Sequence, residues 1–317
     1  MNLQQLQKVQ DDKFYFEISL RQAKKELHRK FNKLPRDDIK RTKSIEIEKI
    51  RFFTKILTSN LNIIPNSFPK DTDLNPFYKE LIENNIGIAR MKRDLSMITG
   101  AIGLIFKFQE LTIKAIRIAK TKEKAITLQK IFLGRTGSVL RSIRKTLADV
   151  EIIRQKLKNE LPTIKTGIKT VCIVGYPNVG KSTLLKTITT ANPEINVYPF
   201  TTKSLMVGYV GKELQLIDSP GTFRDKNEMN TIEKQSYLAI KHLADIIVFV
   251  IDYTESCGYE IPLQEEMLNK IKKEFGDKKL VLYASKSDMM NEEQIKKHSA
   301  ENVFFDPKKL RIFLLKK

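Results

Sequence analysis

Apolar residues in the first half of the chain recur at the spacing of a helix. They fall at Ile45, Ile50, Phe53, Ile56 and Leu57, and again at Leu140, Ile143, Leu147, Val150 and Ile153. Spacings of mostly three or four residues place such side chains on one face of an α-helix. Glycine and proline are sparse over residues 1–160. The pattern predicts an all-α helical bundle.

The breaks expected in this half lie at prolines and glycines. Prolines within residues 64–69 and at Asn75-Pro76 end one helix and open the next. A second long helix is expected from about residue 77 to beyond 118, and a third from about 127 to 157, which Gly134 and Gly137 could interrupt. Residues 160–167 have the composition of a hinge. The helical domain therefore spans residues 1–165.

From residue 166 onward, apolar runs alternate with helical segments. The strand-like runs are 171–174, 205–210, 213–217, 246–251, 280–284 and a weaker one at 303–305. Helices are expected at about 181–191, 230–243, 261–275 and 291–298, with a short one after Pro307. This alternation predicts an α/β domain over residues 166–317, with a mostly parallel six-stranded sheet covered on both faces. The two runs around Gly211-Lys212 predict one antiparallel strand.

The net charge of +20 is carried almost wholly by the first half of the chain. Residues 1–165 hold 35 lysines and arginines against 18 acidic residues, a net charge of +17, and residues 166–317 hold 22 against 19, a net charge of +3. Such an excess indicates a polyanionic partner, either a nucleic acid or an anionic membrane face. A solvated lysine-rich surface is the alternative. Nucleic acid is the reading we favour.

Composition excludes several other classes. With 41% apolar residues the chain is globular. Cys172 and Cys257 cannot form a disulfide framework and indicate a reducing compartment. No secretory signal is expected in residues 1–20, and the longest uncharged apolar stretch, residues 95–106, is too short to span a bilayer. We therefore expect a cytoplasmic protein with no membrane role.

Residues 175–182, with the sequence GYPNVGKS, match the phosphate-loop pattern G-x-x-x-x-G-K-[ST]. They stand between a predicted strand and a predicted helix, where backbone N–H groups converge on phosphate oxygens at a helix N-terminus. Lys181 is expected to reach the β- and γ-phosphates, and Ser182 to bind Mg²⁺. The nucleotide-binding residues predicted here are Gly175, Tyr176, Pro177, Asn178, Val179, Gly180, Lys181, Ser182 and Thr183.

Two later segments are predicted to meet the γ-phosphate and Mg²⁺. Asp218 opens the sequence DSPG after an apolar strand, as a carboxylate that holds Mg²⁺ does, and Gly221 would offer its N–H to the γ-phosphate. Thr201 and Thr202 lie in YPFTTKS, and by spacing alone either hydroxyl could reach Mg²⁺. Loss of the γ-phosphate would release that loop. An ordinary turn at Pro199 is the alternative.

The sequence SKSD follows another buried strand. The carboxylate of Asp288 can accept hydrogen bonds from N1–H and N2–H₂ of guanine, a donor pair that adenine lacks. The stem of Lys286 can lie flat on the base. With Ser285, these residues predict a site for GTP and GDP; ATP is a less favoured alternative while Asp288 is present.

These motifs resemble those of the Obg-related GTPases, most closely the nucleolar GTP-binding protein (NOG) branch in a short archaeal-type form. Similar segments are GYPNVGKS, YPFTTKS, DSPG, NTIEKQ and ESCGY in the second half, and FFTKIL, NPFYKELI and LGRTGSVLRSIRKTLADVEIIRQKL in the first. The resemblance implies a P-loop GTPase that hydrolyses GTP to GDP and phosphate as a switch in biogenesis of the large (50S-type) ribosomal subunit. The helical domain would lie against rRNA of the pre-ribosomal particle.

The resemblance also implies which residues act in hydrolysis. It selects Thr202 rather than Thr201 as the threonine that meets Mg²⁺. The catalytic residues would be Lys181, Thr202, Gly221 and Asn178. The Mg²⁺ ligands would be Ser182, Thr202 and Asp218.

The expected turnover is slow, because Thr222 stands where Ras-like GTPases have a glutamine that orients water. Asn178 could hold K⁺ near the β- and γ-phosphates in place of an arginine finger, or it could only shape the loop. Arg224 is expected to be a solvated residue rather than a charge clamp.

The chain departs from the family pattern in three places. The guanine-recognition motif, here called the base motif, is residues 285–288. Ser285 replaces the asparagine with which this motif begins in the family, which implies some loss of guanine affinity. The last nucleotide-binding motif of the family, a Ser-Ala loop after the sixth strand, has no clear counterpart. Residues 298–301 come too soon after Asp288, and residues 305–307 stand in the expected place but lack the Ser-Ala pair. The chain stops at Lys317 without a long basic extension, which implies a cell without a nucleolus.

The alternative function is a nucleotide-gated RNA-binding placeholder with negligible hydrolysis, which Ser285, Thr222 and the unclear last loop favour. The expected partners are GTP or GDP, large-subunit rRNA and the pre-ribosomal particle, bound by a monomer, with no DNA and no membrane. The sequence assigns no chemistry to residues 255–259.

Overall fold

The computed structural model of the chain describes residues 6–30, 38–159, 161, 164–165, 167–189, 196–197, 206–219, 229, 231–300 and 302–316. The chain divides into two compact units. The helical unit holds residues 1–73 and 82–158, and the sheet unit holds residues 74–81 and 159–317. Residues 74–81 therefore join the sheet unit although they stand far before it in the sequence.

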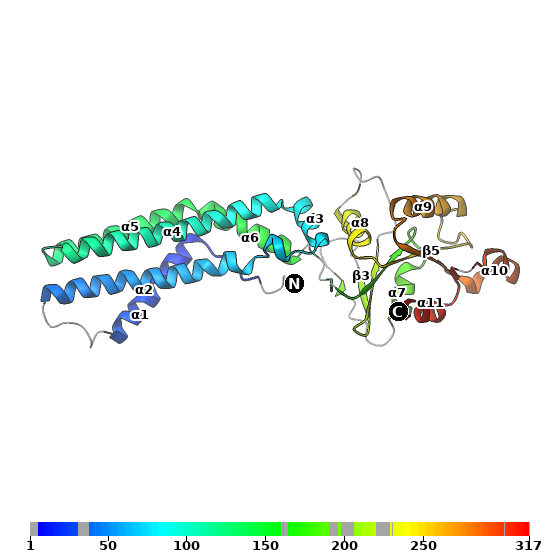
Figure 1. Cartoon of the computed structure of the whole chain (residues 1–317), viewed down its shortest axis with the longest axis horizontal. Coiled ribbons are helices and arrows are strands. Elements are labelled where there is room, and N and C mark those ends of the chain that lie inside the picture. Colours follow the sequence, from blue (N-terminus) through cyan, green and yellow to red (C-terminus); the bar gives the residue numbers. More distant parts are fainter. Residues whose placement is uncertain are drawn as a thin grey trace. The chain divides into compact units, whose positions relative to one another are not determined.

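The helical unit is built around three long helices that pack on one another. Its elements are α1 (Asp12–Lys30), α2 (Asp38–Ser67), η3 (Asp71–Asp73), α4 (Ile88–Ile118), α5 (Lys122–Ser142) and α6 (Arg144–Asn159), and α3 (Pro76–Asn85) begins in the sheet unit. Helix α2 packs against α1, α4 and α5, and α4 and α5 run side by side (Figure 1). Edge-to-face contacts join Phe53 to Phe16 and to Phe132 in the core.

The bundle predicted from the sequence is present, but two of its helices divide at other places. The second predicted helix is broken at Gly87, whose φ of 85° ends the helical geometry between α3 and α4. The third breaks at Ile143, between α5 and α6. The predicted interruption at Gly134 and Gly137 is wrong, because α5 runs through both. Two glycines cost a helix about 1 kcal/mol each, and burial of Phe132, Thr136 and Leu140 on the same helix offsets that cost.

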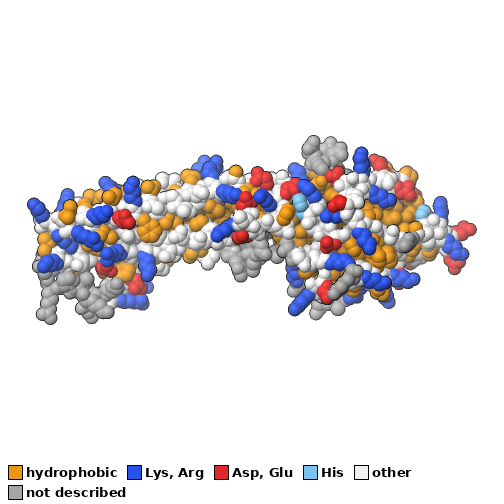
Figure 2. All heavy atoms as spheres, viewed as in Figure 1, with side chains coloured by type: hydrophobic (Ala, Val, Ile, Leu, Met, Phe, Trp, Pro, Cys, Tyr) orange, Lys and Arg blue, Asp and Glu red, His pale blue; other side chains and the backbone are white. Residues whose placement is uncertain are grey.

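Lysine and arginine side chains gather at the end of the helical unit where α4 ends and α5 begins (Figure 2). Ile118 in the same place is 81% exposed. The exposed cations of this region are Lys107, Lys114, Arg117, Lys120, Lys124 and Lys130. The basic excess seen in the sequence therefore lies in part on one end of the bundle.

The described residues of the sheet unit form a seven-stranded sheet in the order β2-β3-β4-β1-β5-β6-β7. The strands are β1 (Lys169–Val174), β2 (Asn196–Val197), β3 (Met206–Val210), β4 (Leu214–Asp218), β5 (Ile246–Ile251), β6 (Lys279–Ala284) and β7 (Val303–Phe304). The helical segments are α7 (Lys181–Ile188), α8 (Thr231–Leu243), α9 (Ile261–Glu274), η4 (Ser287–Met289), α10 (Glu292–His298) and α11 (Pro307–Leu315).

The sheet confirms the predicted fold class. Strands β4, β1, β5, β6 and β7 pair in parallel, and β3 is antiparallel to both of its neighbours. The extra strand is β2, which has two residues and is too short to show a period in the sequence. Because the parallel strands end at one edge, the loops that follow β1, β4, β5 and β6 meet there.

Side chains fasten residues 74–81 and the following connection to the sheet unit. The Tyr78 hydroxyl accepts a hydrogen bond from the Ile164 N–H at 2.9 Å, and Glu80 accepts one from Lys241 Nζ at 2.9 Å. The side chain of Gln215, buried in β4, donates from Nε2 to the Lys165 carbonyl at 2.8 Å. The segment expected to be a hinge is thus held in part by strand and helix residues.

We expect Arg144→Ala to destabilise the helical unit by about 1–3 kcal/mol at pH 7, because it leaves a buried carboxylate unpaired. Arg144 donates from Nε and Nη2 to Asp12 at 2.8 and 3.0 Å, and the Asp12 side chain is 5% exposed. The hydrogen bond from Arg144 lowers the pKa of Asp12. The ion pair therefore stabilises the fold above the unfolded-state pKa of aspartate, and that stabilisation is lost as the pH falls through the lower folded-state pKa.

Denaturant unfolding at pH 7 and at about pH 3 measures this effect. Arg29→Ala is the control, since Arg29 pairs with Glu26 on the surface of α1, and such pairs contribute about 0–1 kcal/mol. A difference between Arg144→Ala and the parent chain that does not shrink at low pH would contradict the assignment to Asp12.

Candidate functional site

The loop after β1 has the backbone geometry of a phosphate cradle. Gly175 has a φ of 152°, and a Cβ there would lie 2.5 Å from the Val250 carbonyl oxygen, so no other residue fits. Gly180 has a φ of 99° and caps α7, and Asn178 is left-handed with a φ of 61°. Three residues with positive φ in this short loop, next to the start of α7, are typical of a backbone turn that binds an anion.

Lys181 is the first residue of α7 and lies under this loop. Its side chain is buried, and Nζ donates a hydrogen bond to the Tyr176 carbonyl at 2.7 Å. The ammonium group is thus held across the loop, as expected of a lysine that reaches the β- and γ-phosphates.

Ser182 and Asp218, the two predicted Mg²⁺ ligands on described residues, are in direct contact. The Ser182 hydroxyl donates to Asp218 Oδ2 at 2.6 Å, and Asp218 is 6% exposed at the end of β4. Among the described residues its Oδ1 is buried without a hydrogen-bond partner. Burial raises the pKa of Asp218, against the effects of Ser182 and Lys181.

This pair of side chains fits a magnesium ion. Mg²⁺ prefers oxygen ligands and binds to proteins through one or two carboxylates together with phosphates. A hydroxyl beside a buried carboxylate with a free oxygen supplies that donor set. A cation would also offset the burial that raises the pKa of Asp218.

The base motif follows β6 and lies beside the phosphate loop. Ser285 is 4% exposed, and its Cβ lies 3.7 Å from the position that a Cβ on Gly180 would take. Its hydroxyl donates to the Ile251 carbonyl at 3.2 Å. Lys286 is left-handed with a φ of 54° and precedes η4, which carries the exposed Asp288. The structure thus brings the phosphate and base motifs to one edge of the sheet.

Sequence reasoning missed Asp252 and Gln264. Asp252 follows β5, is fully buried and accepts a hydrogen bond from Lys286 Nζ at 2.8 Å. Gln264 on α9 is also fully buried, and its amide bonds both the N–H and the carbonyl of Asp252. A signal existed for Asp252, because it directly follows a buried apolar strand, much as Asp218 ends one. The glutamine gave none, since α9 is otherwise an ordinary amphipathic helix.

Several of the residues singled out from the sequence lie outside the described part of the chain. They include Thr202, its neighbour Thr201, Gly221, Thr222 and Arg224. Their roles therefore remain as predicted from the sequence.

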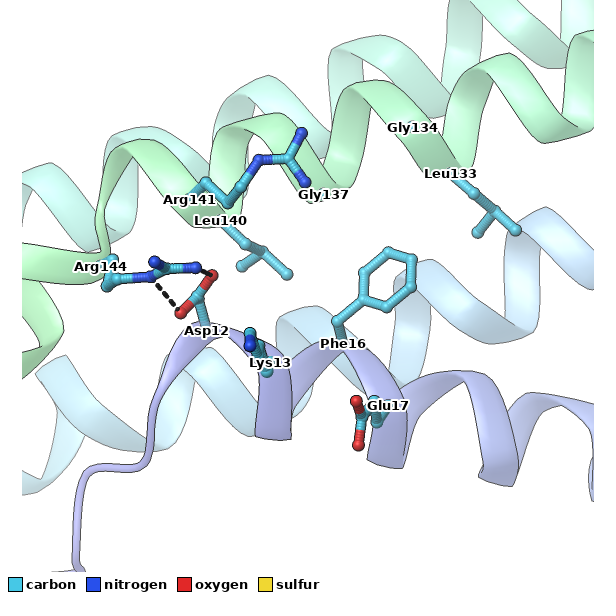
Figure 3. A pocket seen from close by; sticks show the side chains of 10 residues that line it. All are labelled: Asp12, Lys13, Phe16, Glu17, Leu133, Gly134, Gly137, Leu140, Arg141 and Arg144. Carbon is cyan, nitrogen blue, oxygen red and sulfur yellow. Dashed lines mark hydrogen bonds and ion pairs between the residues drawn. The ribbon is translucent and has the colours of Figure 1, made fainter.

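A separate cavity of about 290 Å³ lies in the helical unit, between α1 and α5 (Figure 3). The Phe16 ring points into it, and the bare backbone of Gly134 and Gly137 forms part of its wall. The Phe16 ring comes within 3.7 Å of where a Gly137 Cβ would stand, which is ordinary van der Waals contact, so α1 and α5 pack closely here. The cavity is a feature of helix packing, distant in the chain from the phosphate loop.

Within the described residues, no helix is long and apolar enough to cross a membrane. The parallel sheet, the phosphate loop at the start of α7, the paired Ser182 and Asp218 and the base motif beside them define a P-loop GTPase.

Comparison with known proteins agrees with this class. A family model described as a 50S ribosome-binding GTPase matches residues 170–286, and one described as the NOG1 N-terminal helical domain matches residues 3–165. The chain therefore belongs to the NOG1 family of GTPases, as the resemblance implied.

Several individual proteins are similar to this chain. An uncharacterized protein of Methanocaldococcus jannaschii is 42% identical over 80% of this chain and 71% of its own length. Nucleolar GTP-binding protein 1 of Arabidopsis thaliana is 34% identical over 81% of this chain and 39% of its own. A crystal structure of a nucleolar GTP-binding protein 1 from Plasmodium falciparum is 29% identical over 49% of this chain and 90% of that chain, with a TM-score of 0.37 that adds nothing further.

The chain spans 39% of the length of the Arabidopsis relative and 41% of the Saccharomyces cerevisiae one. The names of these relatives contradict the cytoplasmic location expected from the sequence, since both are nucleolar GTP-binding proteins. That expectation rested on the low cysteine content, on the lack of a secretory signal in residues 1–20 and on the short length of the apolar stretch 95–106. The nuclear interior is also reducing, so cysteine content does not separate the two compartments.

We expect Ser182→Ala to raise the Mg²⁺ concentration needed for half-maximal GTP binding by about tenfold, because the ion loses a hydroxyl ligand. Titration with Mg²⁺ in the presence of a fluorescent GTP analogue measures it. Thr187→Ala is the matched control, since Thr187 is an exposed hydroxyl on the same helix. An unchanged Mg²⁺ requirement in Ser182→Ala would remove this residue from the metal site.

Proposed function

We propose that this protein hydrolyses GTP to GDP and phosphate and acts as a switch in biogenesis of the large ribosomal subunit. The observation that carries the proposal is the hydrogen-bonded pair Ser182–Asp218 next to a phosphate loop that has residues with positive φ. Lys181 donates a hydrogen bond to a carbonyl of that loop. The names of the matched family model and relatives, a 50S ribosome-binding GTPase and nucleolar GTP-binding proteins, support the ribosomal role.

The side chains divide the work of hydrolysis. The loop N–H groups and Lys181 hold the phosphates, and the partial positive charge at the start of α7 favours the charge that develops on them. When bound, Mg²⁺ would neutralise charge shared by the β- and γ-phosphates, held by Ser182, Asp218 and Thr202. Thr202 and Gly221 would release their segments when the γ-phosphate leaves. Intrinsic turnover is slow, since Thr222 cannot orient water as a glutamine does.

The RNA-binding part of the proposal assigns residues 1–165 to rRNA and residues 166–317 to the nucleotide. The charge difference between the two spans, +17 against +3, supports it. Exposed lysines at the junction of α4 and α5 can neutralise RNA phosphates. The affinity of a protein that binds RNA in this way falls steeply as the salt concentration rises. A placeholder that binds RNA and GTP without hydrolysis stays as the second candidate, favoured by Ser285 in place of asparagine.

We expect the triple variant Lys114→Glu, Lys120→Glu and Lys124→Glu to weaken binding of the full chain to large-subunit rRNA and to lower its salt dependence. Each lost phosphate contact reduces the slope of log affinity against log salt by about 0.7–0.9. Filter binding or fluorescence anisotropy at a series of salt concentrations measures both. The matched control reverses the charge of Lys272, Lys273 and Lys309, which are exposed on the sheet unit.

Equal losses in the two triple variants would place no RNA contact at this end of the bundle. Co-sedimentation of the parent chain with large-subunit particles, in the GTP and GDP states, tests the switch itself. Particle binding that does not depend on the nucleotide would favour the placeholder.

We expect hydrolysis to be faster in K⁺ than in Na⁺ at equal ionic strength, by about tenfold or more. Asn178 lies in the phosphate loop with a φ of 61°, and in this proposal its side-chain oxygen would hold the cation beside the phosphates. Asn178→Ala should remove the difference between the two salts while GTP binding persists. Release of phosphate in each buffer measures the rate. Lys181→Ala is the background control, because any activity left in it comes from contamination, and equal rates in both salts would rule out a K⁺ site.

A further inference from the structure

The carboxylate of Asp252 is the most heavily bonded side chain in the described sheet unit. Its Oδ1 accepts from the Thr254 N–H at 2.9 Å and the Thr254 hydroxyl at 2.6 Å. Its Oδ2 accepts from the Cys257 N–H at 2.9 Å, the Ser256 hydroxyl at 3.2 Å and Lys286 Nζ at 2.8 Å. The residue therefore folds the loop 252–259 around itself and reaches the base motif 34 positions later.

Burial of this charge would be costly without these partners. Asp252 is 0% exposed and Lys286 is 25% exposed. Burial alone would raise the pKa of Asp252, but the hydrogen bonds from Lys286 and Thr254 outweigh it and hold the pKa below the usual value for aspartate. A buried carboxylate with these hydrogen bonds stays charged and remains in its ion pair with Lys286.

Lys286 needs such an anchor because its backbone is strained. Its φ of 54° is left-handed, a conformation that costs a residue other than glycine about 1–3 kcal/mol. Its Nζ is fixed by Asp252 and, at 2.8 Å, by the Ser256 hydroxyl. The same residue caps η4, so its conformation sets the direction of the turn that carries Asp288.

The loop also contacts the phosphate side of the site. The Tyr259 ring packs on the Tyr176 ring of the phosphate loop, with centroids 4.4 Å apart. Gln264 holds the loop from behind, through the Asp252 backbone and the Tyr259 carbonyl at 2.8 Å. One loop thus spans from the base motif to the phosphate cradle.

We propose that Asp252 is a positioning residue for guanine recognition: it holds Lys286 in its left-handed conformation and thereby aims Asp288 at the base. The inference rests on the proposed GTP site. It gives residues 255–259, to which the sequence assigned no chemistry, the role of completing the Lys286 anchor. Ser285, which stands where the family has asparagine, does not contribute to this anchor. Its hydroxyl donates to the Ile251 carbonyl.

The test compares GTP with ATP as competitors for a fluorescent guanine nucleotide bound to the full chain. Asp252→Asn keeps the shape of the side chain but removes its negative charge. It also replaces one carboxylate oxygen with an NH₂ group, which then faces the N–H and O–H donors that the oxygen accepted from. We expect the preference for GTP over ATP to fall about tenfold, since the group that reads guanine is misplaced. Asp277→Asn makes the same chemical change at an exposed aspartate of the sheet unit and should leave the preference unchanged.

A purely structural role for Asp252 predicts a different result. In that case Asp252→Asn lowers the thermal stability and weakens both nucleotides equally, so an unchanged ratio overturns the inference. Should Asp252→Asn fail to fold, Ser256→Ala decides, because the Ser256 side chain is exposed and its loss removes the second anchor of Lys286. It should lower the ratio about two- to threefold, and an unchanged ratio there also overturns the inference.

The parent chain separates this inference from the function on which it rests. A parent chain that does not prefer GTP to ATP overturns the proposed function. If the parent chain prefers GTP and the Asp252→Asn variant prefers it by the same ratio, only the positioning role is overturned.

Discussion

Two carboxylates held out of water at one edge of the parallel sheet organise the nucleotide site. Asp218 ends β4 and Asp252 follows β5, and both are buried. A buried carboxylate must be neutralised by a cation or by hydrogen bonds. Asp252 has its cation in Lys286, whereas Asp218 has one hydroxyl partner, Ser182, and one oxygen without any among the described residues. The difference fits the two proposed roles: the satisfied carboxylate would position the site, and the unsatisfied one would bind the metal ion.

Much of this site could be predicted because the phosphate loop is contiguous in the sequence, and its glycines are required by the backbone wherever it occurs. The Asp252–Lys286 contact could not be predicted in that way. It depends on β5 and β6 pairing in parallel with Ile251 opposite Ala284, and hydrophobic periodicity does not contain this register. The same limit applies to α5, where packing of Phe132 and Leu140 keeps a helix continuous through two glycines that local propensity disfavours. Strand β2 was missed because two residues hold no pattern.

The two units differ in how they use charge. In the sheet unit, Asp218 and Asp252 are buried and are held by short hydrogen bonds. In the helical unit, the cations around the junction of α4 and α5 are exposed and numerous. Exposed cations bind a polyanion through counterion release and tolerate imprecise placement. The proposed function, discrimination of one nucleotide together with binding to an RNA surface, would use both kinds of electrostatics.

The placement of residues 74–81 has a consequence for how such a protein can be taken apart. Tyr78 and Glu80 belong to the sheet unit through Ile164, Lys241 and His242, although a cut at the connection near residue 165 would assign them to the other half. A truncated chain that starts at residue 166 would lose Glu80 as the partner of Lys241 and His242, whereas Tyr78 and Ile164 would stay together in the complementary fragment. A division of the chain near residue 165 would therefore leave Lys241 and His242 without the carboxylate that both contact in the intact chain.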